Sequence, residues 1–366
     1  MVPEPQMHIL YTVLDWGLGH ATRSIPVIRA LKNKGVRISI AGNGASLHLL
    51  QMEFPELQAF EVPGMNVRYP VNMPLALALL MQLPRNLLEL SREKKAFSAL
   101  AAKLKPDAII SDNRYGAAVR GFTSVIITHQ LSIRVPESLF LLRPVVRLLN
   151  ENLLRRFSEV WVPDTAENPG LSGELSHRPE VLRSLNVHFT GPLSRLTDLA
   201  AEKSEKDYDV LVLLSGPEPQ RTHLEKSLIR ELSSLRKNIL LVRGKPMQPG
   251  TSAAGNIDIV SHLPAATLKH HISSVPLIIC RPGYSTLMDL AVCGTSAICI
   301  PTPGQTEQEY LADFHGRNKR LVCVLQRHIT DLQKSMELLN ECNPLPYENT
   351  RRLEKLIDEF LNRLGH

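Results

Sequence analysis

The stretch HILYTVLDWGLGHATRSIPVIRAL, residues 8–31, decides the fold that the rest of the chain follows. Its first seven residues form an apolar run that predicts a buried strand, and its last part has the periodicity of an amphipathic helix. Between them lies DWGLGHATR, residues 15–23, where Gly17 and Gly19 allow a tight turn and a close approach of the backbone to a ligand. The stretch therefore predicts a strand, a turn and a helix of a parallel α/β sheet.

The same alternation continues in two series along the chain. Further strands are predicted at residues 36–42, 107–111, 124–129 and 159–163, and then at 208–214, 238–244, 257–263, 275–280, 295–301 and 320–326. Near-continuous apolar strands separated by helical segments indicate parallel sheets that are covered on both faces. We expect an α/β fold of two doubly wound, Rossmann-like domains that face each other across a cleft and bind ligands at the carboxyl ends of their strands.

The length of 366 residues exceeds what one hydrophobic core usually serves, which also favours two domains. A polar stretch after the turn-like TGP at 190–192 predicts the boundary. We expect an N-terminal domain at 1–192, a linker at 193–207, a C-terminal domain at 208–346 and a final helix at 347–366. This helix is amphipathic and is expected to pack back on the N-terminal domain; its apolar face holds Leu353, Leu356, Ile357, Phe360 and Leu361.

The composition is typical of a globular cytoplasmic protein, with 43% hydrophobic and 21% charged residues. The five cysteines are an odd number without a CxxC pair, which favours reduced thiols over a disulfide framework or a zinc site. The first residues lack the basic region of a signal peptide, and the apolar run after them is too short to span a membrane.

The net charge of +6 suggests an anionic partner, and the charge is unevenly distributed. Residues 114–156 contain seven arginines but only two acids, Glu137 and Glu151. Aromatic residues make up only 5% of the chain, which argues against nucleic acid, so an anionic lipid surface or a phosphorylated acceptor fits better. The apolar segments 71–83 and 138–157 are either core helices with a basic outer stripe or helices that lie at a membrane surface.

The turn at 15–23 has two interpretations. Its glycines and the start of the following helix favour an anionic ligand, but Thr22 stands where a dinucleotide fingerprint needs its third glycine. An exposed imidazole at His20 could take a proton from a sugar hydroxyl, or it could only hydrogen-bond the turn. Both interpretations remain open from the turn alone.

Two stretches of the second half carry polar groups after predicted strands. In LLSGPEPQR, residues 213–221, Ser215 and Gly216 form a plausible phosphate cradle, although two prolines make a simple capped turn the better interpretation. The segment 281–310 places acids, amides and hydroxyls after two consecutive strands, which suits the vicinal hydroxyls of a ribose or hexose. Its candidate residues are Arg281, Gly283, Ser285, Thr286, Asp289, Gln308 and Glu309.

GLGHATRSIPVIRAL near the start and RPGYSTLMDLAVCGTSAICIPTPGQTEQEYLA near the end resemble the GT-B fold glycosyltransferases. The resemblance covers nearly the whole chain and is to the group of the peptidoglycan lipid-linked N-acetylglucosaminyltransferase (MurG type) and the diacylglycerol glycosyltransferases. It implies an inverting hexosyltransferase of the cell envelope that uses a nucleotide diphosphate sugar, a UDP-sugar, without metal or other cofactor. It also implies a lipid-linked or other glycan acceptor, with the cytoplasmic enzyme at the inner face of an anionic membrane.

The resemblance also assigns donor-side roles. Asp289 matches the acid that holds the donor ribose, Gln308 and Glu309 match a pair of amides at the donor sugar, and His262 and Leu263 match a backbone contact to the base. Ser215 and Gly216 begin the match to the second glycine-rich loop. Asp289 is one methylene shorter than the usual glutamate, Glu309 is not an amide, and the second loop is poor in glycine, so the donor's identity stays open.

The acceptor side is assigned to the first half of the chain. His20 matches the family's base or acceptor contact, and Asp112 in SDNRYG, residues 111–116, is an alternative base. Acceptor or anion contacts are expected from Gly17, Gly19, Arg23, His129 and Gln130. The base would deprotonate the acceptor hydroxyl in a single displacement, while helix N-termini, with Arg23 or Arg281, stabilise the leaving diphosphate.

Two other functions remain compatible with the sequence. A nucleotide-sugar hydrolase of the pseudaminic acid pathway shares the GxGHxxR start and uses water in place of the acceptor. A nucleotide-sugar binder without activity would need no base at His20. Asp207 and Asp209 spell the metal-binding DxD pattern of the other major glycosyltransferase fold, but a solvated strand edge explains them better.

Overall fold

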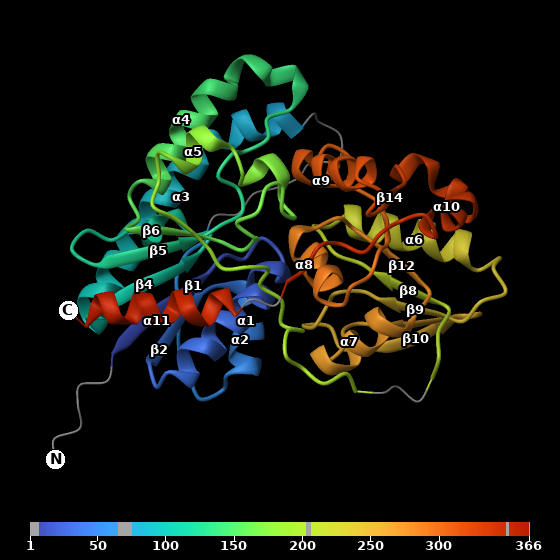
Figure 1. Ribbon diagram of the computed structural model, residues 1–366, viewed down its shortest axis with the longest axis horizontal. Helices are drawn as coiled ribbons and strands as arrows, with labels where there is room; N and C mark the ends of the chain where they lie inside the picture. Colours follow the sequence, from blue (N-terminus) through green and yellow to red (C-terminus); the bar gives the residue numbers. More distant parts are fainter. Residues whose placement is uncertain (1–6, 65–74, 203–205, 349–350, 366) are drawn as a thin grey trace. The chain divides into compact units, whose positions relative to one another are not determined.

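The computed structural model describes residues 7–64, 75–202, 206–348 and 351–365 of the chain (Figure 1). The chain forms two compact units. Unit 1 contains residues 1–193 together with the C-terminal residues 348–366, and unit 2 contains residues 194–347. Each unit is built around a sheet of its own.

The sheet of unit 1 has seven strands in the order β3-β2-β1-β4-β5-β6-β7, and all its pairs are parallel. Its strands are β1 (His8–Val13), β2 (Arg37–Gly42), β3 (Gln58–Glu61), β4 (Ala108–Asp112), β5 (Thr123–Ile127), β6 (Glu159–Val162) and β7 (Val187–Phe189). The two outer strands, β3 and β7, are additional to those predicted. They are short and only partly buried, so they lack the continuous apolar run that identifies a central strand.

Helices cover both faces of this sheet. They are α1 (Leu18–Asn33), α2 (Gly44–Glu53), α3 (Leu75–Leu104), α4 (Arg143–Leu154), α5 (Pro179–Leu182) and α11 (Arg352–Leu364), with the 3-10 helices η1 (Tyr115–Ala117), η2 (Glu137–Leu142) and η3 (Gly173–Leu175). Val160 and Val162 of β6 share a core cluster with Leu154 of α4 and Val181 of α5. Alternate residues of a strand point to opposite faces, so Trp161 lies on the other face, where it contacts α11.

The final helix α11 packs on unit 1, which confirms the expectation for the C-terminal segment. The ring of Phe360 meets Trp161 edge-on with centroids 5.3 Å apart, and Figure 1 shows α11 beside α1. Lys34 at the end of α1 forms an ion pair of 2.6 Å with Asp358. Leu356, Ile357 and Phe360 are buried, so the amphipathic pattern predicts the packed face of the helix.

The sheet of unit 2 has the order β10-β11-β9-β8-β12-β13-β14 and is parallel except for the antiparallel pair β10–β11. Its strands are β8 (Val210–Leu213), β9 (Ile239–Val242), β10 (Thr251–Ala254), β11 (Ile257–Val260), β12 (Leu277–Cys280), β13 (Ile298–Cys299) and β14 (Val322–Cys323). Its helices are α6 (Gln220–Leu232), α7 (Ala265–Ser274), α8 (Tyr284–Val292), α9 (Thr306–Arg317) and α10 (Leu332–Leu339), with the 3-10 helix η4 (Gln326–Asp331). The prediction of two α/β, Rossmann-like domains is confirmed.

The first part of the expected linker is packed in unit 2. Ser194 and Leu196 are buried. The Lys269 ammonium on α7 donates to the carbonyl oxygens of Leu196 at 3.1 Å and Leu199 at 2.8 Å. The hydroxyl of Ser194 donates to Asp289 of α8, so the start of the expected linker is part of the candidate site described below.

Three further observations concern the sequence predictions. The five cysteines are all free thiols. Among the described residues, no helix combines the length and the apolar character that crossing a membrane requires. Of the apolar segment at 71–83, residues 71–74 lie outside the described residues and the rest begins α3, whereas the segment at 138–157 forms most of η2 and the whole of α4.

Candidate active site

The first candidate site lies in unit 1, at the carboxyl ends of three neighbouring strands. His20 and Arg23 stand in the first turns of α1, directly after β1. Asp112 is the last residue of β4 and pairs with Val13 of β1. His129 follows β5, the next strand of the sheet. The sheet order thus brings together residues that are far apart in the sequence.

These four side chains, which we call the His20 cluster, form one hydrogen-bonded network. The Nδ1 atom of His20 lies 2.6 Å from Oδ1 of Asp112. Arg23 donates to both carboxylate oxygens of Asp112, from Nε at 2.6 Å and from Nη2 at 2.7 Å. The Nη1 atom of Arg23 also lies 3.2 Å from Nδ1 of His129. Arg23 therefore links Asp112 to the loop after β5.

The electrostatics of the cluster define its protonation. Burial raises the pKa of Asp112, but Arg23 and His20 together outweigh it and hold this pKa below its ordinary value. Burial and the charge of Arg23 lower the pKa of His20, although Asp112 opposes them. At neutral pH the cluster therefore holds an ionised carboxylate and a neutral imidazole.

The tautomer of His20 follows from its partner. Nδ1 of His20 lies 2.6 Å from Oδ1 of Asp112 and 3.0 Å from Nη2 of Arg23. An ionised carboxylate only accepts hydrogen bonds, so the shorter contact assigns the proton to Nδ1, and Nη2 of Arg23 donates to Oδ1 of Asp112 at 2.7 Å. The other ring nitrogen, Nε2, then has a lone pair that can accept a proton. The side chain of His20 is 15% exposed whereas that of Asp112 is fully buried, so only His20 is open to a substrate.

The turn after β1 is held by α2. Gly17 has a φ of +112°, which favours glycine, and Gly19 accepts a hydrogen bond from the Thr22 hydroxyl at 3.1 Å. Oδ1 of Asp15 accepts from the backbone N–H of Ser46 at 2.9 Å. These contacts hold the backbone from which α1 and His20 begin.

The loop after β5 carries the remaining acceptor-side candidates. The backbone N–H of Gln130 donates to the Thr128 hydroxyl at 3.1 Å, and the carbonyl of His129 accepts from Ser176 at 2.6 Å. His129 is buried, so its place is inside the network. Gln130 is partly exposed.

The second candidate site lies in unit 2, where the predicted donor residues follow neighbouring strands. Ser215 and Gly216 come after β8, His262 and Leu263 after β11, and the residues from Arg281 to Thr286 after β12. Gln308 and Glu309 stand in the first turn of α9, which follows β13. Because these strands are parallel members of one sheet, the structure gathers all the predicted donor residues at its carboxyl edge.

Asp289 of α8 has an unusual environment at this edge. Its Oδ1 accepts a hydrogen bond of 2.5 Å from the hydroxyl of Ser194. Burial raises the pKa of Asp289 to about 6, although the charge of Arg195 and the Ser194 hydrogen bond work against the increase. The carboxyl group therefore titrates close to neutral pH.

Several predicted donor residues have structural partners. Arg281 is buried and donates to the carbonyl of Ile300 and to Oε1 of Gln326, both at 2.8 Å, and burial lowers its pKa to about 10. Oε1 of Gln308 accepts from the backbone N–H of Thr302, and Oε1 of Glu309 accepts from that of Gly304, each at 2.8 Å. These three side chains shape the loop between β13 and α9.

The glycine turn after β8 lies close to a hydroxyl that the sequence analysis did not identify. Gly216 has a φ of +100°, and a Cβ atom added there would lie 3.9 Å from Oγ1 of Thr302. Thr302 is buried and its hydroxyl has no hydrogen-bond partner in the described parts of the chain. The partner of Asp289, Ser194, was also missed. Neither belongs to a recognisable local pattern, since each acts through contacts from elsewhere in the sequence.

His262 remains neutral over the physiological range, because burial and the charge of Arg195 lower its pKa to about 4. No group of three His, Cys, Asp or Glu side chains within the described ranges is arranged to hold a metal ion. Asp209 of the DxD pattern directly precedes β8, and its carboxylate accepts a hydrogen bond of 2.7 Å from the backbone N–H of Asn238, which directly precedes β9. This contact agrees with a role at the start of the strands.

Comparison with protein families gives two matches in different parts of the chain. Residues 7–120, which hold His20, Arg23 and Asp112, match the model described as glycosyl transferase family 1. Residues 226–361, which hold Asp289 and the β13–α9 loop, match the model described as glycosyltransferase family 28 C-terminal domain.

Similar proteins come from archaea and bacteria. An uncharacterized glycosyltransferase of Methanosarcina acetivorans is 25% identical over 83% of this chain and 82% of its own length. A second relative, from Polaromonas naphthalenivorans, is 26% identical over 79% of this chain and 77% of its own length. It is a UDP-N-acetylglucosamine–N-acetylmuramyl-(pentapeptide) pyrophosphoryl-undecaprenol N-acetylglucosamine transferase.

Solved structures share the fold at low identity. Acinetobacter baumannii MurG superposes with a TM-score of 0.59 at 14% identity, covering 97% of this chain and all of that one. A UDP-glucosyltransferase from Polygonum tinctorium superposes with a TM-score of 0.63 at 13% identity and covers both chains completely.

Proposed function

Because the chain is a glycosyltransferase of the GT-B fold that resembles the MurG type, we propose that it is an inverting, metal-independent enzyme. It transfers a sugar from a nucleotide diphosphate sugar, a UDP-sugar, to a hydroxyl of a lipid-linked or other glycan acceptor. The observation that carries the proposal is the His20 cluster, in which a neutral, partly exposed imidazole is oriented by a buried carboxylate.

The proposed reaction is a single displacement. Nε2 of His20 takes the proton of the acceptor hydroxyl while its oxygen attacks the anomeric carbon of the donor sugar. The bond between that carbon and the diphosphate breaks, and the electron pair leaves with the diphosphate. Attack from the opposite side inverts the anomeric centre. The imidazolium that forms is stabilised by Asp112, which lies 2.6 Å from Nδ1.

The geometry favours His20 over Asp112 as the base. Both oxygens of Asp112 accept hydrogen bonds from Arg23, its side chain is fully buried, and its pKa is lowered. A carboxylate with these properties is a weak base that substrate does not reach. Asp112 is thus a positioning residue, and Arg23 fixes it.

The donor is assigned to unit 2. The match to a family 28 C-terminal domain and the UDP-sugar named for the relatives support this assignment. Asp289 would accept from the ribose hydroxyls, and the backbone at His262 and Leu263 would contact the base. Arg281 and Arg23 are engaged in internal hydrogen bonds, so the start of α8 at Ser285 and Thr286 is the better stabiliser of the leaving diphosphate.

A lipid-linked acceptor and contact with an anionic membrane are supported by the surface of η2 and α4. Arg143 and Arg147 lie one turn apart on α4 and are half exposed. Large apolar side chains are exposed on the same elements: Phe140, Leu141, Val145, Leu148 and Leu149. Apolar insertion and the attraction of arginine to anionic lipid add to each other, so this surface suits a peripheral membrane enzyme at the inner face.

The proposal is tested by binding and turnover. A thermal-shift panel of nucleotide diphosphates and nucleotide sugars should identify a donor, since a ligand that binds the native state raises its apparent stability. Turnover is then measured with that donor, with and without candidate lipid-linked acceptors and with and without EDTA. We expect His20→Ala to lower the turnover about 10²–10⁴-fold while leaving the thermal shift unchanged.

Other outcomes would contradict parts of this proposal. Free sugar released equally well without acceptor would indicate a hydrolase, and donor binding without turnover would indicate a binder. Loss of activity in EDTA that Mg²⁺ restores would exclude metal independence. If no nucleotide shifts the transition, the donor site at Asp289 is wrong.

A further inference from the structure

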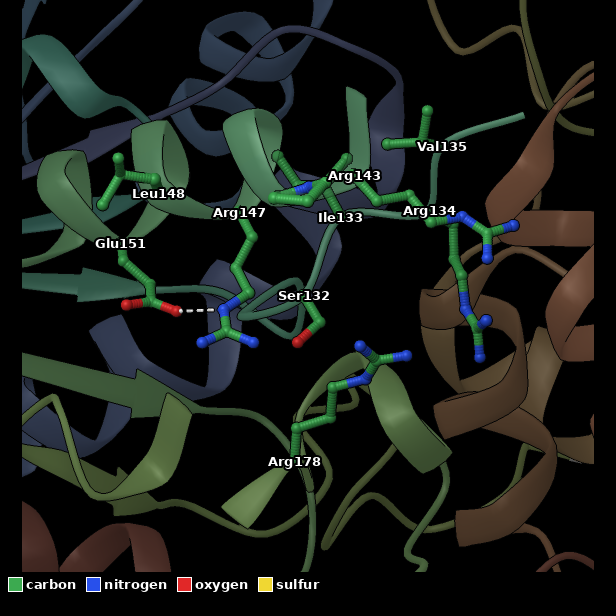
Figure 2. Close-up of a pocket in the computed structure, with 10 residues that line it drawn as sticks. Ser132, Ile133, Arg134, Val135, Arg143, Arg147, Leu148, Glu151 and Arg178 are labelled. Atoms are coloured by element: carbon green, nitrogen blue, oxygen red, sulfur yellow. Dashed lines mark hydrogen bonds and ion pairs between the residues drawn. The ribbon is translucent and has the colours of Figure 1, made fainter. Parts of the chain in front are cut away.

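A pocket of about 470 Å³ lies in unit 1 where the loop after β5 passes η2 and α4 (Figure 2). It is distinct from the His20 cluster, none of whose residues lines it. Four of its ten lining residues are arginines: Arg134, Arg143, Arg147 and Arg178. Such a concentration of guanidinium groups around one cavity is typical of sites that bind phosphate or carboxylate groups.

The carboxylates around the pocket do not balance its arginines. Glu151, which lines it, contacts Arg147 at 2.9 Å and also Arg155, outside the pocket, at 3.2 Å. Glu174 contacts both Arg134 at 2.8 Å and Arg178 at 2.9 Å. The highly exposed Glu137 pairs with Arg143. The four arginines that line the pocket thus share three carboxylates, one of which also holds Arg155, so positive charge predominates around the pocket.

Ser132 provides an independent indication of a ligand. Its hydroxyl oxygen is buried and has no hydrogen-bond partner in the described residues, while its backbone N–H donates to Leu175 at 2.8 Å. In the view of Figure 2, this hydroxyl lies between the guanidinium groups of Arg147 and Arg178. A buried hydroxyl without a partner is costly unless a ligand satisfies it, and a phosphate oxygen can accept from it.

Apolar side chains continue from the pocket onto the surface. Leu148 lines the pocket and is 56% exposed, and Leu141 of η2 is 76% exposed. Phe140, Val145 and Leu149, on the same two elements, are also more than half exposed. An anion site that borders exposed apolar groups fits an amphiphile with a phosphate group and a hydrocarbon chain better than it fits free inorganic phosphate.

The pocket is connected to the His20 cluster through a short loop. Ser132 is three residues after His129, so their Cα atoms are at most about 10 Å apart. Asn150 of α4 holds this loop by donating to the carbonyl oxygens of Gln130 at 3.1 Å and Leu131 at 3.0 Å. A phosphate bound in the pocket would thus lie within reach of a molecule whose hydroxyl contacts His20.

We infer that this pocket binds the phosphate or diphosphate group of an amphiphilic acceptor, an inference that rests on the proposed transfer function. Arg147 and Arg178 hold the phosphate oxygens, Ser132 donates its hydroxyl to one of them, and the hydrocarbon chain lies along η2 and α4. The rest of the acceptor then extends along the loop after β5 toward His20. The pocket thereby gives the enzyme its selectivity for phosphorylated acceptors.

The test compares a polyprenyl diphosphate with the same polyprenol lacking phosphate, each in neutral detergent. For the intact protein we expect tighter binding of the diphosphate. The double variant Arg147→Gln and Arg178→Gln should weaken that binding about tenfold or more, because it removes two guanidinium groups that donate charge-assisted hydrogen bonds to the phosphate. Arg156→Gln, an exposed arginine outside the pocket, is the matched control and should leave the affinity unchanged.

Ser132→Ala separates binding from folding. Because the hydroxyl has no partner in the protein, its removal should leave the melting temperature unchanged or slightly higher and still weaken diphosphate binding several-fold. A loss of stability without a loss of affinity would overturn the role given to Ser132.

Three results would overturn the inference itself. The first is that the intact protein binds the diphosphate and the alcohol with equal affinity. The second is that the double variant binds the diphosphate as tightly as the intact protein does. The third is that the double variant loses only its binding to phosphatidylglycerol vesicles. The last would assign the pocket to a membrane headgroup. The thermal shift by the nucleotide donor reports on unit 2 and serves in every variant as the control. If no nucleotide shifts the transition of the intact protein, the proposed function is wrong. If the nucleotide shift is normal but the pocket variants bind the diphosphate as the intact protein does, only the role of the pocket is wrong.

Discussion

At the residue scale, Arg23 contributes, after burial, to the lowered pKa of His20, the proposed base. Burial and the charge of Arg23 both lower the pKa of His20, whose ordinary value is 6.5. Since a base must be neutral, kcat/KM of the intact enzyme should be constant above this lowered pKa and fall as the pH drops through it. Arg23→Gln removes the positive charge and leaves Asp112, which raises the pKa. The acidic limb of the pH profile should therefore move to higher pH.

The position of this limb is independent of the fraction of folded enzyme wherever that fraction is constant with pH, which circular dichroism of the variant over the same pH range checks. Arg29→Gln is the matched control, because Arg29 stands on the same helix but pairs with Glu53. Its profile should coincide with that of the intact enzyme. A limb that stays in place in Arg23→Gln would mean that the titrating group is not His20.

If Asp289 holds the donor ribose as proposed, its titration makes donor binding depend on pH. Its pKa of about 6 is above the ordinary value of 3.8, chiefly because of burial, while the Ser194 hydrogen bond lowers it. The ionised carboxylate is the form that accepts from ribose hydroxyls, so UDP affinity should decline as the pH falls through about 6. Ser194→Ala removes one stabiliser of the ionised form, and the midpoint should shift upward.

Calorimetric titration of UDP across this pH range measures the shift. Ser296→Ala is a suitable control, because that hydroxyl donates to the carbonyl of Asn343 and not to a candidate donor residue. If UDP affinity does not vary between neutral and mildly acidic pH, Asp289 does not bind the ribose.

At the scale of elements, the start of α2 depends on a glycine. Gly44 has a φ of +58°, and a Cβ atom there would lie 1.9 Å from Oδ2 of Asp15. Gly44→Ala should lower the free energy of unfolding by about 1–3 kcal/mol through the backbone alone, and further through the displaced carboxylate. Gly121→Ala shares a positive φ of +88° but has open space around it. Urea unfolding of both variants isolates the contact, and equal losses would show that Asp15 moves aside at no cost.

The sequence predicts best those strands that have apolar surroundings on both faces of the sheet. The central strands of both sheets are buried on two faces, so runs such as the one from Ile9 to Leu14 identify them. β3, β7 and β10 lie at or near sheet edges and are partly exposed, so polar residues interrupt their pattern. Local composition therefore predicts the fold class but not the full number of strands.

The residues of the candidate sites, too, are only partly predictable from the sequence. His20 and Asp112 are identified as candidates because ligands bind at the turns after strands in α/β folds. Their contact was not predictable from spacing, since it depends on β1 and β4 being neighbours. Ser132, Ser194 and Thr302 are ordinary hydroxyl residues in the sequence, and only the packing around them distinguishes them.

At the scale of the whole molecule, the last helix, α11, belongs to the same compact unit as the first half of the chain. Phe360 is buried against Trp161, next to Ile357, which is fully buried. Phe360→Ala should lower the free energy of unfolding of unit 1 by about 3–5 kcal/mol, the usual result of removing a large buried ring. Asn362→Ala changes an exposed residue of the same helix and should have little effect.

A chain of two units need not unfold in one transition, and this makes the prediction specific. If UDP binds unit 2 as proposed, it raises the transition of that unit by mass action and so identifies it in a calorimetric scan. Phe360→Ala should lower the transition that UDP does not raise and leave the other in place. Should the variant instead lower the UDP-sensitive transition to the same extent, the two units unfold together, and α11 stabilises the whole chain through unit 1.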